Sequence, residues 1–100
     1  NERKSETTVL LFTADWCPHC KRAKPEWDKF ESSHNGKEIG NYIVKTQMVD
    51  CTDGDSPLIQ QHGIDGYPTV IMIKDNNQRV NYDAKINESS LAGFVQSVLA

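Results

Sequence analysis

An apolar run near the start of the chain passes directly into a helix-forming segment, and this junction restricts the possible folds more than any other feature. Residues 7–13 read Thr-Thr-Val-Leu-Leu-Phe-Thr, a pattern typical of a strand that is buried on both faces. Pro18 lies at the first turn of the segment that follows, where its missing N–H costs no hydrogen bond. The sequence therefore predicts a buried strand and then a helix that extends to about Ser32.

The rest of the chain alternates between strand and helix patterns. Gly36 and Gly40 indicate a loop after the first helix. Further elements are expected in this order: a strand at 42–49, a short helix from Pro57 to about Gly63 capped by Ser56, strands at 69–73 and 79–83, and a final amphipathic helix capped by Asn87 or Ser89. Two strands joined by a helix pair in parallel with a right-handed crossover. The sequence thus predicts an α/β fold, in which helices cover both faces of a mixed sheet of about four strands.

Length and charge limit the classes of protein to which the chain can belong. One hundred residues match a single domain, residues 1–100, and we expect residues 1–6 to be flexible. The net charge of −3 gives no bulk attraction to nucleic acid, and no apolar run approaches the ~20 residues that span a bilayer. No signal peptide is predicted, because no apolar stretch follows a basic segment at the start. We expect a monomer that neither binds nucleic acid nor inserts into a membrane.

Cys17 and Cys20 are the candidate reactive groups. The strand–helix junction places Cys17 at the carboxyl edge of the sheet, beside free backbone N–H groups and the positive end of the helix dipole. Both effects stabilise a thiolate, so the pKa of Cys17 should fall from ~8.5 into the range of ~3.5–7. Cys20 lies three residues further on, on the same helix face and near enough to form a disulfide. The pattern predicts thiol–disulfide exchange, with Cys17 as nucleophile and Cys20 as resolving thiol, and needs no cofactor.

The two residues between the cysteines should set the reduction potential. Pro18 stiffens the turn, and His19 adds a hydrogen-bond donor or a cation beside the sulfur. Because stabilising the thiolate favours the reduced pair, the disulfide becomes a stronger oxidant. We therefore predict a potential between about −120 and −200 mV, in the oxidising half of the known range.

Other interpretations of the cysteines and histidines remain open at this level. The Cys17–Cys20 pair could form a structural disulfide or half of a zinc site, although the chain has no second Cys-x-x-Cys or His pair, and we predict no metal. Cys51 is interpreted as a buried small apolar residue, with a redox or dimer-forming role as the alternative. The isolated His34 and His62 are expected on the solvated surface.

Three ordered segments resemble the protein disulfide isomerase domains of the thioredoxin superfamily. These are Ala14-Asp15-Trp16-Cys17-Pro18-His19-Cys20-Lys21 with Pro25 and Glu26 after it, Val49-Asp50-Cys51-Thr52, and Gly66-Tyr67-Pro68-Thr69. The Cys-Pro-His-Cys tetrad is similar to that of the bacterial periplasmic disulfide oxidase. The resemblance implies a thioredoxin fold and a cis peptide bond before Pro68, which should lie against the cysteine pair. It also implies that the Tyr67 backbone pairs with extended substrate, and that Trp16 and Thr69 help to hold it.

Two positions depart from this family pattern. Leu11 occupies the position of a buried carboxylate that takes the proton of the resolving thiol, and Met48 occupies that of its partner lysine. Losing both charges should stabilise the core. It should also slow the resolving step or make that step depend on water.

The sequence predicts a protein thiol–disulfide oxidoreductase of the oxidase or isomerase type. The alternatives are a thioredoxin-like reductase and a protein-binding module with little turnover. Expected partners are protein or peptide thiols and disulfides, together with glutathione or a partner reductase or oxidase. The isomerase-like segments favour the lumen of the endoplasmic reticulum, with the cytoplasm as the alternative. The last residues, Ser97-Val98-Leu99-Ala100, form no retention signal.

Overall fold

A mixed sheet forms the centre of the molecule. The computed structural model describes residues 5–74 and 78–99, and in them five strands form one sheet in the order β2-β3-β1-β4-β5. The strands are β1 (Ser5–Thr13), β2 (Glu38–Ile39), β3 (Tyr42–Asp50), β4 (Thr69–Ile73) and β5 (Arg79–Tyr82). The central strand β1 is parallel to β3 and antiparallel to β4. The parallel pair with its helical crossover confirms the predicted topology.

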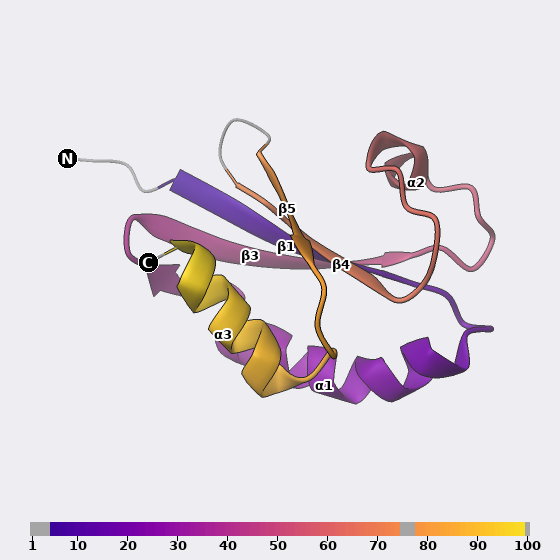
Figure 1. Ribbon diagram of the computed structural model, residues 1–100, viewed down its shortest axis with the longest axis horizontal. Coiled ribbons are helices and arrows are strands. Elements are labelled where there is room, and N and C mark those ends of the chain that lie inside the picture. The colour runs from indigo at the N-terminus through magenta and orange to yellow at the C-terminus, as the bar shows by residue number, and fades with distance from the viewer. Residues whose placement is uncertain (1–4, 75–77, 100) are drawn as a thin grey trace.

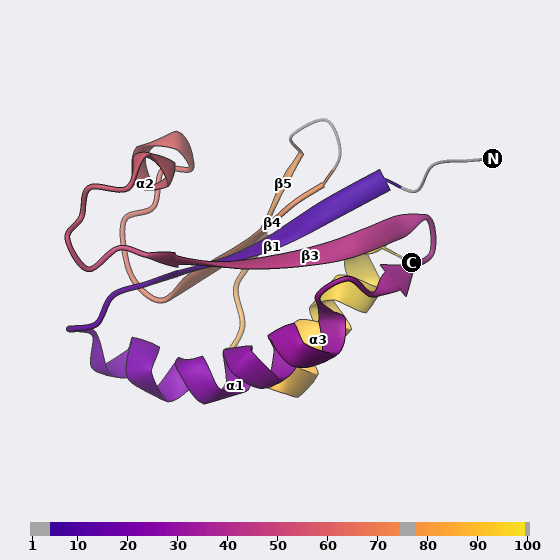
Figure 2. The same ribbon diagram turned by 180° about the vertical axis from the view of Figure 1, so that it is seen from behind.

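Helices cover both faces of this sheet, as predicted. The long helix α1 (Pro18–His34) and the C-terminal helix α3 (Glu88–Leu99) lie side by side on one face (Figures 1 and 2). The short helix α2 (Pro57–Gln61) lies on the opposite face. Ser56 caps α2 by accepting a hydrogen bond from the Leu58 N–H at 3.3 Å, which confirms the predicted start of this helix.

Strand β1 supplies side chains to two cores because both of its faces are covered. Val9 and Leu11 pack with Trp27 and Phe30 of α1 and with the apolar face of α3. The alternate residues of β1 contact the α2 side of the sheet: Leu10 and Phe12 pack against Val49, Leu58 and Ile59. A strand buried on both faces explains the nearly continuous apolar run in the sequence.

The structure corrects two strand predictions. The segment between α1 and β3, predicted as a loop, contains the two-residue strand β2, which pairs with the start of β3. Two residues are too few to show a periodic pattern. The flexible start predicted for residues 1–6 is wrong for Ser5 and Glu6, which belong to β1 and pair with Tyr42 and Ile43. The parallel neighbour β3 supplies hydrogen-bonding partners that local sequence cannot indicate. The remaining residues 1–4 lie outside the described residues.

His34 is buried, not on the solvated surface as predicted. Its ring stacks on Phe30 with 4.6 Å between centroids, and its Nδ1 is 2.7 Å from the Ser33 hydroxyl. Because residues four apart lie on the same face of a helix, His34 follows Phe30 into the core. Burial lowers the pKa of His34. His62 is half-buried against the edge of Phe12.

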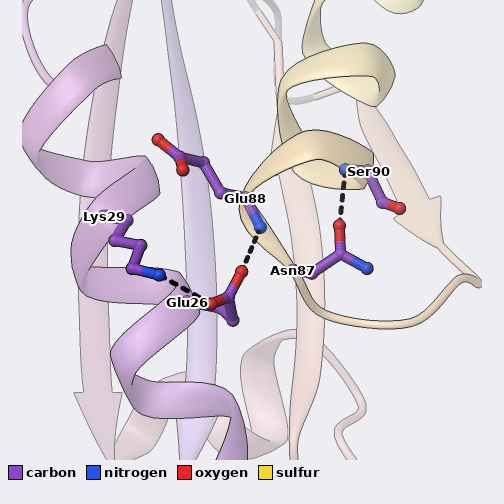
Figure 3. Close-up of polar contacts among 5 residues, drawn as sticks. All are labelled: Glu26, Lys29, Asn87, Glu88 and Ser90. Carbon is purple, nitrogen blue, oxygen red and sulfur yellow. Dashed lines mark hydrogen bonds and ion pairs between the residues drawn. The ribbon is translucent and has the colours of Figure 1, made fainter.

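The start of α3 is attached to α1 through a carboxylate. Asn87 caps α3, because its Oδ1 accepts the N–H of Ser90 at 2.8 Å. Glu26 of α1 accepts the backbone N–H of Glu88 through Oε1 at 3.0 Å and the Lys29 ammonium through Oε2 at 3.1 Å (Figure 3). These donors lower the pKa of Glu26, with the Glu88 N–H as the largest cause. The link places the β5–α3 connection beside the N-terminal half of α1.

Candidate active site

Cys17 occupies the N-cap position of α1, immediately beyond the end of β1. Its backbone is extended, and the helix begins at Pro18. The Sγ of Cys17 accepts the backbone N–H of Cys20 at 3.4 Å. This is one of the N–H groups that a helix leaves unpaired at its first turn. The strand–helix junction therefore places the sulfur where a negative charge is favoured.

The two thiols differ in acidity. Burial is nearly equal, with Cys17 5% and Cys20 3% exposed. The pKa of Cys17 is lowered, mainly because the Cys20 thiol donates a hydrogen bond to it, and further by the backbone N–H groups of Cys20 and His19. The pKa of Cys20 is raised, first by burial and then by its hydrogen bond to Cys17. The pair therefore consists of one thiol that ionises readily and one that keeps its proton.

This difference predicts the pH dependence of alkylation. In the reduced wild type, the rate at which iodoacetamide modifies Cys17 should rise with pH and reach its half-maximum below the value of ~8.5 for free cysteine. Only the thiolate reacts, so a lowered pKa extends reactivity toward acid. In a Cys17→Ala variant, Cys20 and Cys51 should react only at higher pH, since burial raises the pKa of both. A wild-type midpoint equal to that of free cysteine would contradict the assignment of Cys17 as the acidic thiol.

The loop before β4 lies against the cysteine pair. The Tyr67–Pro68 peptide bond is cis, as predicted. The Tyr67 carbonyl accepts a hydrogen bond from the Cys17 thiol at 3.6 Å, and Tyr67 also packs on the cluster of Ala14, Cys17 and Cys20. The Thr69 hydroxyl donates to a carbonyl within the same loop. The loop therefore brings Tyr67 to the reactive sulfur, with Pro68 next to it in the chain, whereas the Thr69 hydroxyl is already occupied.

Trp16 and His19 lie on the exposed side of the site. The Trp16 side chain is 62% exposed and meets the ring of Tyr67 edge to face, with 5.8 Å between centroids. The His19 side chain is exposed. The backbone N–H of His19, not its ring, contributes to the lowered pKa of Cys17. Trp16, Tyr67 and Cys17 thus form one contiguous surface, while a role of the His19 ring in setting the potential stays a prediction.

Sequence reasoning missed a hydrogen-bonded support beneath Trp16. The Trp16 indole N–H donates to the Thr52 carbonyl at 3.1 Å, and the Asp15 N–H donates to the Thr52 hydroxyl oxygen at 3.0 Å. The Thr52 hydroxyl in turn donates to Asp50 Oδ1. The predicted topology could have indicated this support. The parallel strands β1 and β3 end at the same edge of the sheet, where Thr13 pairs with Asp50, so the residues that follow them lie close together. The loop that carries Cys17 is therefore attached to the end of β3.

The interpretation of Cys51 as a buried small residue is confirmed. Its side chain is fully enclosed in the core on the α2 side of the sheet, and its thiol donates to the Val49 carbonyl at 3.6 Å. Burial raises the pKa of Cys51. In residues 5–74 and 78–99, no group of three His, Cys, Asp or Glu side chains could hold a metal ion. No helix of that part of the chain is long and apolar enough to cross a membrane.

The two departures from the family pattern lie side by side. Leu11 is 1% exposed and pairs with Met48 in the β1–β3 register. Next to them a cleft of about 360 Å³ opens beside Cys20, and Thr13, Met48 and Asp50 are among its lining residues. The Thr13 hydroxyl makes a hydrogen bond to Cys20. An apolar residue thus fills the position of the family's buried carboxylate, while a cleft that Thr13 and Asp50 help to line opens near the resolving thiol.

Comparison with known proteins identifies the family. The sequence model of the thioredoxin family matches residues 2–97. The chain belongs to the thioredoxin family. The solution structure of the first thioredoxin domain of mouse protein disulfide-isomerase A4 superposes on 94% of this chain and 64% of that one, with a TM-score of 0.77 and 29% identity. The α/β architecture is therefore the thioredoxin fold, with one short strand more than the four predicted.

Several curated relatives of this thioredoxin domain are protein disulfide isomerases or isomerase-like proteins. Protein disulfide-isomerase of Humicola insolens is 31% identical over 93 residues, which are 93% of this chain and 17% of the relative. Protein disulfide-isomerase-like protein EhSep2 of Emiliania huxleyi is 35% identical over 68 residues, which are 68% of this chain and 29% of the relative. The chain thus spans less than a third of these relatives. Membership confirms the predicted resemblance and supports a place in a family of thiol–disulfide oxidoreductases.

Proposed function

We propose that this domain catalyses disulfide formation and isomerisation in other proteins through the Cys17–Cys20 pair. The observation that carries the proposal is the position of Cys17 at the N-cap of α1, where the Cys20 N–H contacts its sulfur and the Tyr67–Pro68 loop lies beside it. A thiolate is stabilised there, and a second thiol waits one turn away. The isomerase relatives support the choice of protein substrates.

The exchange proceeds in two steps that need no cofactor. In the oxidising direction, a substrate thiolate attacks Cys17 of the Cys17–Cys20 disulfide, a substrate–Cys17 disulfide forms, and Cys20 leaves as a thiolate that takes up a proton. A second substrate thiolate then attacks the substrate sulfur of this bond, and Cys17 leaves with the electron pair. Two electrons pass to the cysteine pair and the substrate gains a disulfide. The hydrogen bonds to Cys17 stabilise it as the leaving thiolate.

The exposed surface around Cys17 holds the substrate in this proposal. Trp16 and Tyr67 supply rigid aromatic area, and their edge-to-face contact fixes their relative position. The Tyr67 and Pro68 backbone serves as an edge for an extended substrate segment. Thr69 acts indirectly, since its hydroxyl closes the loop on Gly66.

The resolving thiol requires an exit for its proton because Leu11 occupies the carboxylate position. The cleft beside Cys20 provides it: Thr13 contacts the sulfur, and the exposed carboxylate of Asp50 lies in the same lining. Water in this cleft carries the proton from Cys20 to solvent. This route needs no buried charge. It makes the resolving step slower than it would be if a carboxylate held next to the sulfur accepted the proton.

The reduction potential tests the direction of electron flow. After equilibration of the domain with glutathione buffers, the potential should lie between about −120 and −200 mV. Replacing His19→Ser should make the potential more negative, because a donor or cation near the thiolate is lost. A value near −270 mV would favour the thioredoxin-like reductase. If Cys17 and Cys20 form no reversible disulfide with each other in these glutathione buffers, the proposed function is overturned.

A binding module with little turnover is the second candidate. Leu11 favours it, since its burial in the apolar core leaves that position without a proton acceptor. Such a module would form a stable complex with a partner through the same surface and would catalyse few rounds of exchange. Multiple turnovers in a refolding assay would exclude it.

A further inference from the structure

A second cleft begins at the active site and extends away from the cysteines. It has a volume of about 520 Å³ and lies between α1 and the connection from β5 to α3, which crosses beside α1 in Figure 1. His19 and Pro68 line it at the active-site end, and Arg22 and Lys85 line it further along. The space accommodates one or two side chains of a bound peptide.

The carboxylate in the lining of this cleft is already neutralised by its neighbours. Each oxygen of Glu26 accepts a donor, from the Lys29 ammonium on one side and from the Glu88 N–H at the start of α3 on the other (Figure 3). The positive end of the α3 dipole further offsets this charge. Glu26 therefore contributes structure at the base of the cleft and has little free charge to repel an anion.

Two cationic residues and an asparagine also line the cleft. Arg22 and Lys85 are both exposed, and the ion pairs found in residues 5–74 and 78–99 involve neither of them. Asn87 uses its Oδ1 to accept the Ser90 N–H, which leaves its amide NH₂ available. The position of Lys85 is fixed in part, because its carbonyl accepts the Tyr82 hydroxyl. Two cationic residues, Arg22 and Lys85, thus line one cavity together with Asn87.

We infer that this cleft binds an acidic side chain of the substrate, close in sequence to the cysteine that reacts with Cys17. The inference rests on the proposed function and names its substrate class: segments in which Glu or Asp accompanies the reacting cysteine. Arg22 presents two N–H groups in the geometry that a carboxylate accepts, and Lys85 adds a second positive charge. Because both cations are exposed, the preference is moderate and decreases with salt.

Three activated peptides test the inference on the reduced domain. They differ only in the residue beside a single cysteine, which is Glu, Gln or Lys, and each cysteine carries a neutral 2-thiopyridyl group as a disulfide. The Cys17 thiolate attacks the peptide sulfur, the bond to thiopyridine breaks, and the released thiopyridone takes the electron pair and a proton. Its absorbance gives the second-order rate constant. The Glu peptide should react about 3–10-fold faster than the Gln peptide at low salt, and the Lys peptide more slowly than both.

Matched double variants locate the preference. Replacing Arg22→Gln together with Lys85→Gln should bring the Glu and Gln peptides within about twofold of each other, while the Gln peptide keeps its wild-type rate constant. Lys37→Gln with Lys45→Gln removes the same charge from exposed residues that line neither cleft, and should preserve the preference.

The possible outcomes distinguish a failure of the inference about the cleft from a failure of the proposed exchange reaction. Equal rate constants for the three peptides in the wild type would overturn the inference and leave the proposed function standing. A preference that survives in the Arg22/Lys85 variant, or that disappears equally in the Lys37/Lys45 variant, would also overturn it. A wild type that releases no thiopyridone from any peptide would refute the proposed function, and the role of the cleft in catalysis with it.

Discussion

Replacing Cys17→Ala should reduce disulfide exchange to the uncatalysed rate. Cys17 carries the thiolate that forms the bond to substrate, and the pKa of Cys20 is raised by burial, so Cys20 cannot take over the attack. Replacing Cys20→Ala should leave the first attack intact but block resolution, so that substrates accumulate as disulfides to Cys17. Recovery of activity from scrambled ribonuclease measures turnover, and non-reducing gels detect the trapped complexes.

Cys51→Ala provides the matched control for these variants. Cys51 is buried in the core on the α2 side, and its thiol contacts the Val49 carbonyl. We expect its replacement to keep the refolding rate near that of the wild type. Full refolding activity in the Cys17 variant would show that the nucleophile is misassigned. Loss of the trapped complexes when Cys51→Ala is combined with Cys20→Ala would assign Cys51 a redox role.

Replacing Leu11→Asp should destabilise the domain strongly and speed resolution. Leu11 is fully enclosed among Val9, Trp27 and Phe30, so the substitution removes a buried apolar side chain and adds a carboxyl group with no partner. The free energy of unfolding should fall by at least about 3 kcal/mol. The loss should be smaller in mild acid, where the carboxyl is protonated. Urea denaturation of the reduced protein measures it.

Met48→Lys should compensate part of that loss. Residues 11 and 48 are register partners on adjacent parallel strands, and Met48 is 39% exposed, so a lysine there can reach the new carboxylate while its stem stays packed. Met48→Lys alone should change stability little. The double variant should be at least about 1 kcal/mol more stable than the sum of the single changes predicts.

The rate of resolution distinguishes proton transfer from simple loss of stability. Leu11 lies on the same face of β1 as Thr13, which contacts Cys20, so a carboxylate at position 11 should accelerate release of substrate from the Cys17 disulfide. Leu11→Asn, which places an amide of similar size at this position and cannot accept the proton, should destabilise without this acceleration. Equal resolution rates in the Asp and Asn variants would refute the proposed water-dependent route in the wild type.

Strong local patterns account for the correct fold predictions. The apolar run of β1, the Pro18 start of α1 and the Ser56 cap of α2 depend on residues close in sequence, and each was located from the sequence. The errors occur where distant segments decide. Strand β2 exists because β3 supplies its partner, and His34 is buried because the last turn of α1 lies on the core. Residues close in sequence indicate neither the pairing with β3 nor the burial of His34 in the core.

The sequence by itself determined the reactive pair: a strand that runs into a helix, with cysteines three residues apart at its first turn, places one sulfur against the helix N–H groups. That outcome depends only on local geometry. The tertiary structure alone decided what surrounds the pair, from the Thr52 support beneath Trp16 to the cleft that Arg22 and Lys85 both line. These groups are brought together by packing of the helices on the sheet. Their distances therefore depend on the whole chain, and no spacing in the sequence encodes them.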